Sequence, residues 1–150
     1  MKSKNELFGW IFGLAIAIGL GTVYYSAIVS PFLNGSGNVH HTGYQLFLNR
    51  WVQDINQSCP VQMTEDVRLD SCTTSNLRIN YYYTLSHKMS SALTTESMDI
   101  MSSNLIEQVT TDPGLNGMRK NEVSFAYYYF DINGMLVFSK LISPEDYAVN

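Results

Sequence analysis

The feature that most constrains this chain is an uncharged apolar run from Leu7 to Val29. A helix of that length spans about 34 Å, enough to cross the roughly 30 Å hydrocarbon core of a bilayer. A cleaved signal peptide would have an apolar stretch of only about 7–15 residues, so the run favours an uncleaved anchor. We therefore predict a transmembrane signal-anchor helix over residues 7–30, preceded by a tail of residues 1–6.

The charges that flank this run predict its orientation. Lys2 and Lys4 precede it, opposed only by Glu6, and the next Lys or Arg in the sequence is Arg50. Because cytoplasmic flanks carry the excess of basic residues, the N-terminus is expected in the cytoplasm. The chain then reads as a single-pass protein of a bacterial inner membrane, with its C-terminal part in the periplasm.

Small residues recur along the predicted anchor at every fourth position, as Gly9, Gly13, Ala17 and Gly21. This spacing gives one helix face that is nearly bare of side chains. Helices in a bilayer associate through such faces because their backbones can approach closely. We therefore predict packing against another transmembrane helix, from a second copy or from a different subunit.

Charge and cysteine content narrow the classes of partner. The net charge is −4, and no stripe of Lys or Arg is present, which argues against binding nucleic acid or a polybasic lipid site. The two cysteines, Cys59 and Cys72, both lie in the predicted exported part. In an oxidising compartment this pair predicts one disulfide, with two free buried thiols as the alternative.

A linker is predicted over residues 31–43, because Pro31 ends the anchor and a polar Gly-rich stretch follows. A periplasmic domain of residues 44–150 then begins with a helix over residues 44–57. Its apolar positions follow the spacing of one buried helix face, at Tyr44, Phe47, Leu48, Trp51, Val52 and Ile55.

The rest of the domain alternates strands and a helix. Strands are expected over residues 66–72 and 77–85, then a helix over 95–109, then strands over 122–130 and 135–142. Asn133-Gly134 is a strong hairpin signal and would place Tyr129 opposite Phe138 and Phe130 opposite Val137. The predicted fold class is α+β, with the order αββαββ, a four-stranded antiparallel sheet and both helices on one face.

Two tyrosine triplets, over residues 81–83 and 127–129, fall within predicted strands. Alternation along a strand puts Tyr82 and Tyr128 on the outer face if Tyr81 and Tyr83 face the helices. Exposed tyrosine is typical of interaction surfaces, so Tyr82 and Tyr128 form a candidate interaction surface. Aromatic pairs that only stabilise the sheet are the alternative.

The sequence contains no pattern that specifies a chemical reaction. His40, His41 and His87 lack neighbouring ligands at the spacing of a metal site. The carboxylates are expected in solvated turns and strand ends, and no nucleophile has a base partner; those considered are Glu65, Asp66, Asp70 and Asp131. We therefore predict no catalytic residues, no metal site, no cofactor and no enzymatic activity.

An anchor, a short linker and a small α+β domain give an overall layout similar to that of the bitopic inner-membrane assembly proteins of type II secretion and type IV pilus systems. Those proteins carry small ferredoxin-like periplasmic domains, usually after a long coiled coil that this chain lacks. The sequence thus favours a non-enzymatic single-pass subunit of an inner-membrane complex, with a protein partner in the periplasm. The alternatives are a membrane-tethered inhibitor or immunity-type binding protein and an accessory domain that binds a small ligand.

Overall fold

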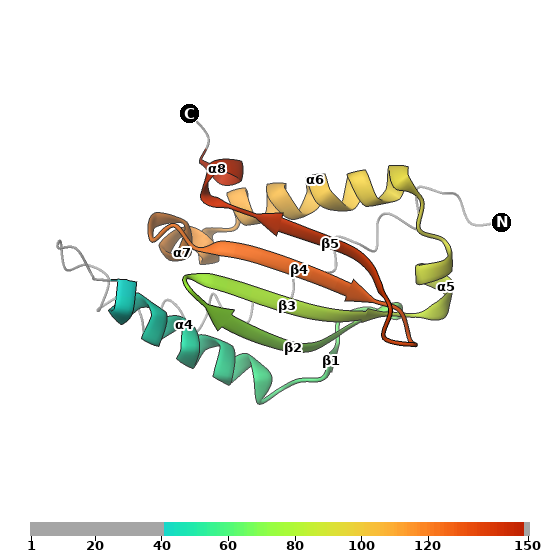
Figure 1. The fold of residues 1–150 in the computed structure, drawn as a ribbon, viewed down its shortest axis with the longest axis horizontal. Coiled ribbons are helices and arrows are strands. Elements are labelled where there is room, and N and C mark those ends of the chain that lie inside the picture. The colour runs from blue at the N-terminus through green and yellow to red at the C-terminus, as the bar shows by residue number, and fades with distance from the viewer. Residues whose placement is uncertain (1–40, 149–150) are drawn as a thin grey trace.

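The computed structural model describes residues 41–148, which form an α+β domain with one five-stranded sheet and helices packed against it (Figure 1). Its elements in chain order are α4 (His41–Asn56), β1 (Val61–Gln62), β2 (Val67–Ser75), β3 (Arg78–Leu85), α5 (His87–Ser91), α6 (Thr95–Thr111), the 3-10 turn η3 (Pro113–Leu115), α7 (Asn116–Lys120), β4 (Ser124–Phe130), β5 (Leu136–Ile142) and α8 (Pro144–Tyr147). The predicted fold class is therefore confirmed at the level of a mixed α+β domain.

The predicted anchor over residues 7–30, with its stripe of small residues, lies outside the described residues, as do the tail and most of the linker. Among the helices within residues 41–148, none has the length and apolar character needed to cross a membrane.

The strands lie side by side in chain order, from β1 at one edge to β5 at the other. The prediction of a fully antiparallel sheet of four strands is wrong in two respects. Strand β3 pairs with β4 in parallel, and the short strand β1 adds a fifth member by pairing with β2. A parallel pair needs a crossover connection, and here the chain supplies it through α5, α6 and α7.

Both long helices contribute to a single hydrophobic core on one face of the sheet. Leu48, Trp51 and Val52 of α4 and Met101 and Leu105 of α6 are buried in the same cluster as the inward-facing residues of β3 and β4. The predicted placement of two helices on one face is thus observed. We call this side of the sheet the covered face and the opposite side the open face.

The two helices begin and end through local polar contacts. Helix α4 starts by His41, three residues before the predicted Tyr44. Helix α6 starts at Thr95, where Thr94 and Ser97 form a reciprocal capping box. At its other end, Arg119 donates to the carbonyls of Val109 and Asp112, at 2.7 Å each, and so satisfies groups that the helix leaves unpaired.

The turn between β2 and β3 comes later than residues 73–76, the gap between the two predicted strands. Strand β2 continues to Ser75, and the turn is made by Asn76 and Leu77, which both have positive φ angles (50° and 54°). Gln45 of α4 accepts a hydrogen bond from the Leu77 amide at 2.8 Å. The turn is therefore fixed by a helix that lies 32 residues earlier in the chain.

The hairpin between β4 and β5 forms where Asn133-Gly134 predicts it. Tyr129 lies opposite Phe138 as expected, but Phe130 lies opposite Leu136 and not Val137, because the register shifts by one residue at this point. The loop is longer than a two-residue turn. The Asp131 carboxylate accepts hydrogen bonds from the Asn133 and Met135 amides, at 2.8 Å each, and holds this wider turn.

Candidate functional site: the open face of the sheet

Burial alternates along the central strands and defines the two faces. On β3, Ile79, Tyr81, Tyr83 and Leu85 are buried, whereas the residues between them are partly exposed. Strand β4 continues the same alternation through Phe125, Tyr127 and Tyr129, although Ala126 on the open face is also buried. The structure therefore places Tyr82 and Tyr128, the candidate interaction residues, on the open face.

The parallel pairing of β3 and β4 sets the two tyrosine triplets in register. Tyr81 lies beside Tyr127, Tyr82 beside Tyr128 and Tyr83 beside Tyr129. On the open face the rings of Tyr82 and Tyr128 stack with centroids 5.3 Å apart and an angle of 13° between their planes. The sequence contains both triplets, but it gave no signal that they would become neighbours.

The Tyr82–Tyr128 stack joins a polar half of the open face to an apolar half. The Tyr82 hydroxyl lies 3.2 Å from the Thr73 hydroxyl, which also accepts a hydrogen bond from the Asn80 side chain at 3.1 Å. Both contacts are on the side of β2. The hydroxyl of Tyr82 is thus directed toward β2, and its ring remains available as flat apolar surface.

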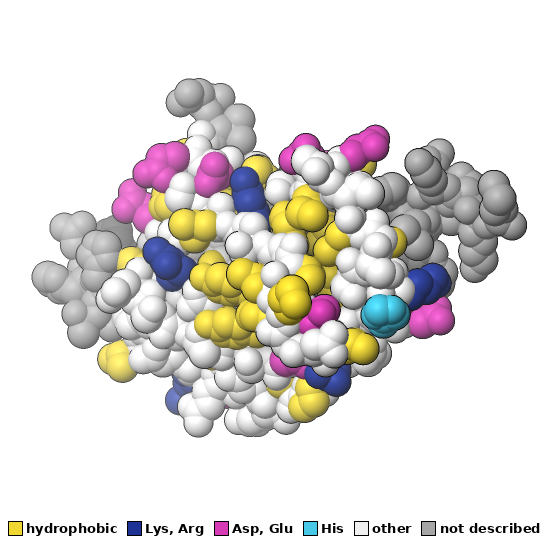
Figure 2. Space-filling model, turned by 45° about the vertical axis from the view of Figure 1, so that its right-hand side comes forward, with side chains coloured by type: hydrophobic (Ala, Val, Ile, Leu, Met, Phe, Trp, Pro, Cys, Tyr) yellow, Lys and Arg dark blue, Asp and Glu magenta, His cyan; other side chains and the backbone are white. Residues whose placement is uncertain are grey.

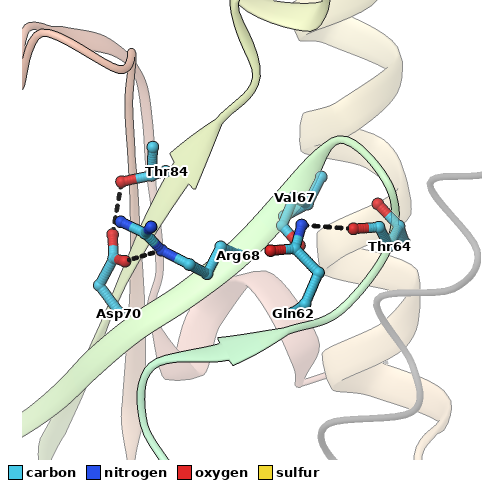
Figure 3. A network of polar contacts seen from close by, with 6 residues as sticks. All are labelled: Gln62, Thr64, Val67, Arg68, Asp70 and Thr84. Carbon is cyan, nitrogen blue, oxygen red and sulfur yellow. Dashed lines mark hydrogen bonds and ion pairs between the residues drawn. The ribbon is translucent and has the colours of Figure 1, made fainter.

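Farther along β2, charged side chains pair with one another (Figure 3). Arg68 donates to Asp70 at 2.6 Å, and the Thr84 hydroxyl donates to the other oxygen of the same carboxylate. At the neighbouring β1–β2 turn, Gln62 donates to the Thr64 carbonyl at 2.6 Å. Asp70 is therefore engaged as an ion-pair and hydrogen-bond partner of Arg68 and Thr84.

The apolar half of the open face lies over β4 and β5. Figure 2 shows apolar side chains gathered across the middle of one side of the molecule, with charged side chains spaced around them. Of the five large apolar residues that are exposed among the described residues, four belong to the β4–β5 hairpin or to β5 itself: Ile132, Met135, Leu136 and Leu141. Apolar surface that is concentrated in this way is typical of protein-interaction sites.

The covered face also carries tyrosines, but these cannot act on a substrate. Tyr81, Tyr127 and Tyr129 are at most 3% exposed, and their hydroxyls have no hydrogen-bond partner within residues 41–148. Burial raises the pKa of all three phenols, and that of Tyr83, well above the ordinary value. They stay neutral at physiological pH and are unsuited to general-base catalysis.

Both cysteines are free thiols in the structure, so the predicted disulfide is not formed there. Cys72 is buried on β2, and the Asn56 side chain at the end of α4 bonds to both its amide (2.7 Å) and its carbonyl (2.8 Å). Cys59 follows in the next turn, where its amide donates to the Asn56 carbonyl at 3.2 Å. Burial raises the pKa of both thiols, which disfavours the reactive thiolate.

Of the remaining acidic candidates, Glu65 is exposed, and the other two have structural partners. Asp66 accepts a hydrogen bond from the Ser86 hydroxyl, and Asp131 holds the β4–β5 turn. Within residues 41–148, no group of three or more His, Cys, Asp or Glu side chains is arranged to hold a metal ion. The stripe formed by Gly9, Gly13, Ala17 and Gly21 lies outside the described part of the chain.

Comparison with known proteins places the domain in a family. A family model described as a domain of unknown function, DUF8479, matches residues 46–138. The chain belongs to this family. In the structure, the DUF8479 match runs from within α4 to within β5, so it includes both tyrosine triplets. No curated protein sequence matches the chain.

Solved structures of similar fold come from bacteria. The pilotin EpsS of the Vibrio vulnificus type 2 secretion system has a TM-score of 0.61 at 8% identity, over 73% of this chain and 96% of its own. The pilotin AspS of the Vibrio cholerae type II secretion system has a TM-score of 0.56 at 10% identity, over 71% and 94%. A Pseudomonas aeruginosa protein described as secreted has a TM-score of 0.57 at 11% identity, over 68% and 94%. At these identities the similarity establishes the fold alone.

Proposed function

We propose that this chain is a non-enzymatic, membrane-anchored subunit of a bacterial envelope complex, whose α+β domain binds another protein through the open face. The observation that carries the proposal is the Tyr82–Tyr128 stack, on a sheet face that the long helices leave uncovered. On the neighbouring strand β5, Ser139 pairs with Tyr128, and the exposed Leu136 and Leu141 lie on either side of Ser139 along the strand. Rigid aromatic rings with apolar neighbours are the usual centres of protein interfaces.

Two of the structures with the same fold are pilotins of type II secretion systems, which supports a role in a secretion-type assembly. In this proposal residues 7–30 hold the chain in the inner membrane and residues 44–150 lie in the periplasm. The stripe of Gly9, Gly13, Ala17 and Gly21 then packs against a second transmembrane helix, from a partner subunit or another copy.

The open-face contact is tested with the full-length chain, by changing Tyr82→Ser and Tyr128→Ser together and isolating the protein from native membranes. Partner proteins that co-purify with the wild type should be lost. Leu46→Ser is the matched control, because Leu46 is 66% exposed but lies on α4. Unchanged association of the double variant, with an unchanged thermal transition, would refute the proposal.

The stripe is tested separately with Gly13→Leu and Gly21→Leu in the full-length chain. Two bulky side chains on that face should abolish co-purification of a helix partner, while Leu14→Ala and Leu20→Ala off the stripe should leave it intact. If the stripe variants retain all partners and the tyrosine variants lose them, the helix only localises the domain.

The pairing of Cys59 with Cys72 remains a proposal for the protein in an oxidising compartment. It is supported by Asn56, which contacts both cysteine backbones at the junction of α4 and β2. Alkylation of the protein, isolated from cells and then denatured without reduction, should modify neither cysteine. If mass spectrometry detects alkyl groups on both cysteines, the disulfide is excluded.

A further inference from the structure

The two edges of the sheet differ greatly in length. At one edge, β1 has two residues. At the other, β5 has seven residues, and within residues 41–148 it pairs only with β4, so no described strand bonds to its outer N–H and C=O groups. Long unpaired edges pair readily with other extended chains, and proteins commonly shorten or cover them unless the edge is used.

The side chains beside this edge favour the pairing of β5 with an added strand from another chain. Leu136 and Leu141 are 49% and 48% exposed, and Ile132 and Met135 in the adjoining loop are more exposed still. Lys140 is the only charged residue in β5 itself. A strand added here would lay alternate apolar side chains beside Leu141 and extend the apolar half of the open face.

The two ends of the same edge are acidic. Asp131 lies in the loop before β5, and Glu145 and Asp146 follow it in α8. Hydrogen bonds lower the pKa of each carboxyl group. Asp131 accepts one from the Met135 amide, and Glu145 and Asp146 accept from Ser143. All three are ionised at neutral pH, so they attract a partner with positive ends. An antiparallel second copy would instead bring acidic ends together.

We propose that β5 is the docking edge for an extended segment of a partner protein, with alternating apolar side chains and a basic residue at each end. This inference rests on the proposed protein-binding function and specifies how the partner binds. Backbone hydrogen bonds to the edge of β5 provide affinity. The exposed leucines beside the edge and the acidic residues at its two ends provide selectivity.

The test uses the full-length chain in detergent micelles and a synthetic peptide, Lys-Val-Thr-Val-Thr-Val-Lys, at millimolar concentration. Amide hydrogen exchange of residues 136–142 should slow about tenfold in its presence, because edge amides gain acceptors. Exchange at β1 should not change. Two control peptides should each give less than a third of this protection. One has Glu at both ends, which removes the charge match. The other has Pro at its centre, which removes a strand hydrogen bond.

A protein variant provides the complementary arm. Leu141→Glu should remove the protection by the Lys-ended peptide. Leu46→Glu, which changes another exposed leucine that lies on α4, should retain it. The proposal is overturned if the peptide protects no β5 amide, if the Glu-ended peptide protects equally, or if β5 is already protected by self-association that rises with protein concentration. Since no native partner enters this experiment, its failure leaves the co-purification test of the proposed function independent.

Discussion

On the covered face of the sheet, Tyr81, Tyr83, Tyr127 and Tyr129 are at most 3% exposed, whereas Tyr82 and Tyr128 on the open face are only half-buried. All six stack in pairs at similar spacing, with ring centroids 4.9 to 5.3 Å apart. The pair geometry is therefore the same on both faces, and what differs is whether a helix lies above it. The covered pairs lie in the core, and the described helices leave the open pair at the surface.

The largest expected difference between the faces is in stability. Tyr129→Ala should lower the free energy of unfolding by about 4 kcal/mol, because it leaves a cavity in the core. Tyr128→Ala, one residue earlier, should lower it by about 1 kcal/mol, mainly through loss of the stack with Tyr82. Urea denaturation of the two variants measures both values. Equal losses would mean that the open face is as well packed as the covered one.

A smaller difference is expected in alkaline solution. The folded-state pKa of Tyr129 is raised by burial above the unfolded value of about 10, so its stabilising contribution is complete below pH 10 and is lost as the pH rises further. Tyr129→Phe removes this group. The free-energy difference between wild type and Tyr129→Phe should therefore shift by about 1.4 kcal/mol in favour of the variant between neutral pH and pH 11.

Denaturation of both proteins at pH 8 and pH 11 measures this shift, and the comparison cancels the ionisation of Lys and Arg. A shift below a few tenths of a kcal/mol would show that the Tyr129 phenol ionises as easily in the folded protein as in the unfolded one.

The smallest single effects, about 1 kcal/mol each, concern hydroxyl groups at neutral pH. The Tyr129 hydroxyl has no hydrogen-bond partner among residues 41–148, whereas that of Tyr147 donates to the Val123 carbonyl at 2.9 Å. Tyr129→Phe should therefore raise the free energy of unfolding by about 1 kcal/mol, and Tyr147→Phe should lower it by about 1 kcal/mol. Thermal unfolding distinguishes the two signs, and a loss in both variants would show that the Tyr129 hydroxyl does have a partner.

Much of the local structure could be predicted from residue patterns. The apolar spacing from Tyr44 to Ile55 predicts α4, and the alternation from Leu77 to Leu85 predicts β3 together with the outward placement of Tyr82. These patterns are informative because each reflects a single helix or strand that buries one face against the apolar core. The predicted hairpin at Asn133-Gly134 was correct to within one residue for the same reason, since turn chemistry is local.

The pairing of β3 with β4 could not be predicted in this way. Their 38-residue connection, from Ser86 to Val123, is long enough to return the chain in either direction, and alternation along a strand is the same in parallel and antiparallel sheets. The two-residue strand β1 and the short helix α8 carry no periodic signal either. Tyr147, which lies beyond the last predicted strand, nonetheless fills part of the core.

The sequence by itself determined that this is a mixed α+β domain and which tyrosines share a strand face, because those properties depend on the spacing of neighbouring residues. Only the tertiary structure decided that Tyr82 would stack on Tyr128 and that β5 would form an open edge beside exposed leucines. Those features depend on which distant strands meet, and that choice is made by the packing of the whole core around α4 and α6.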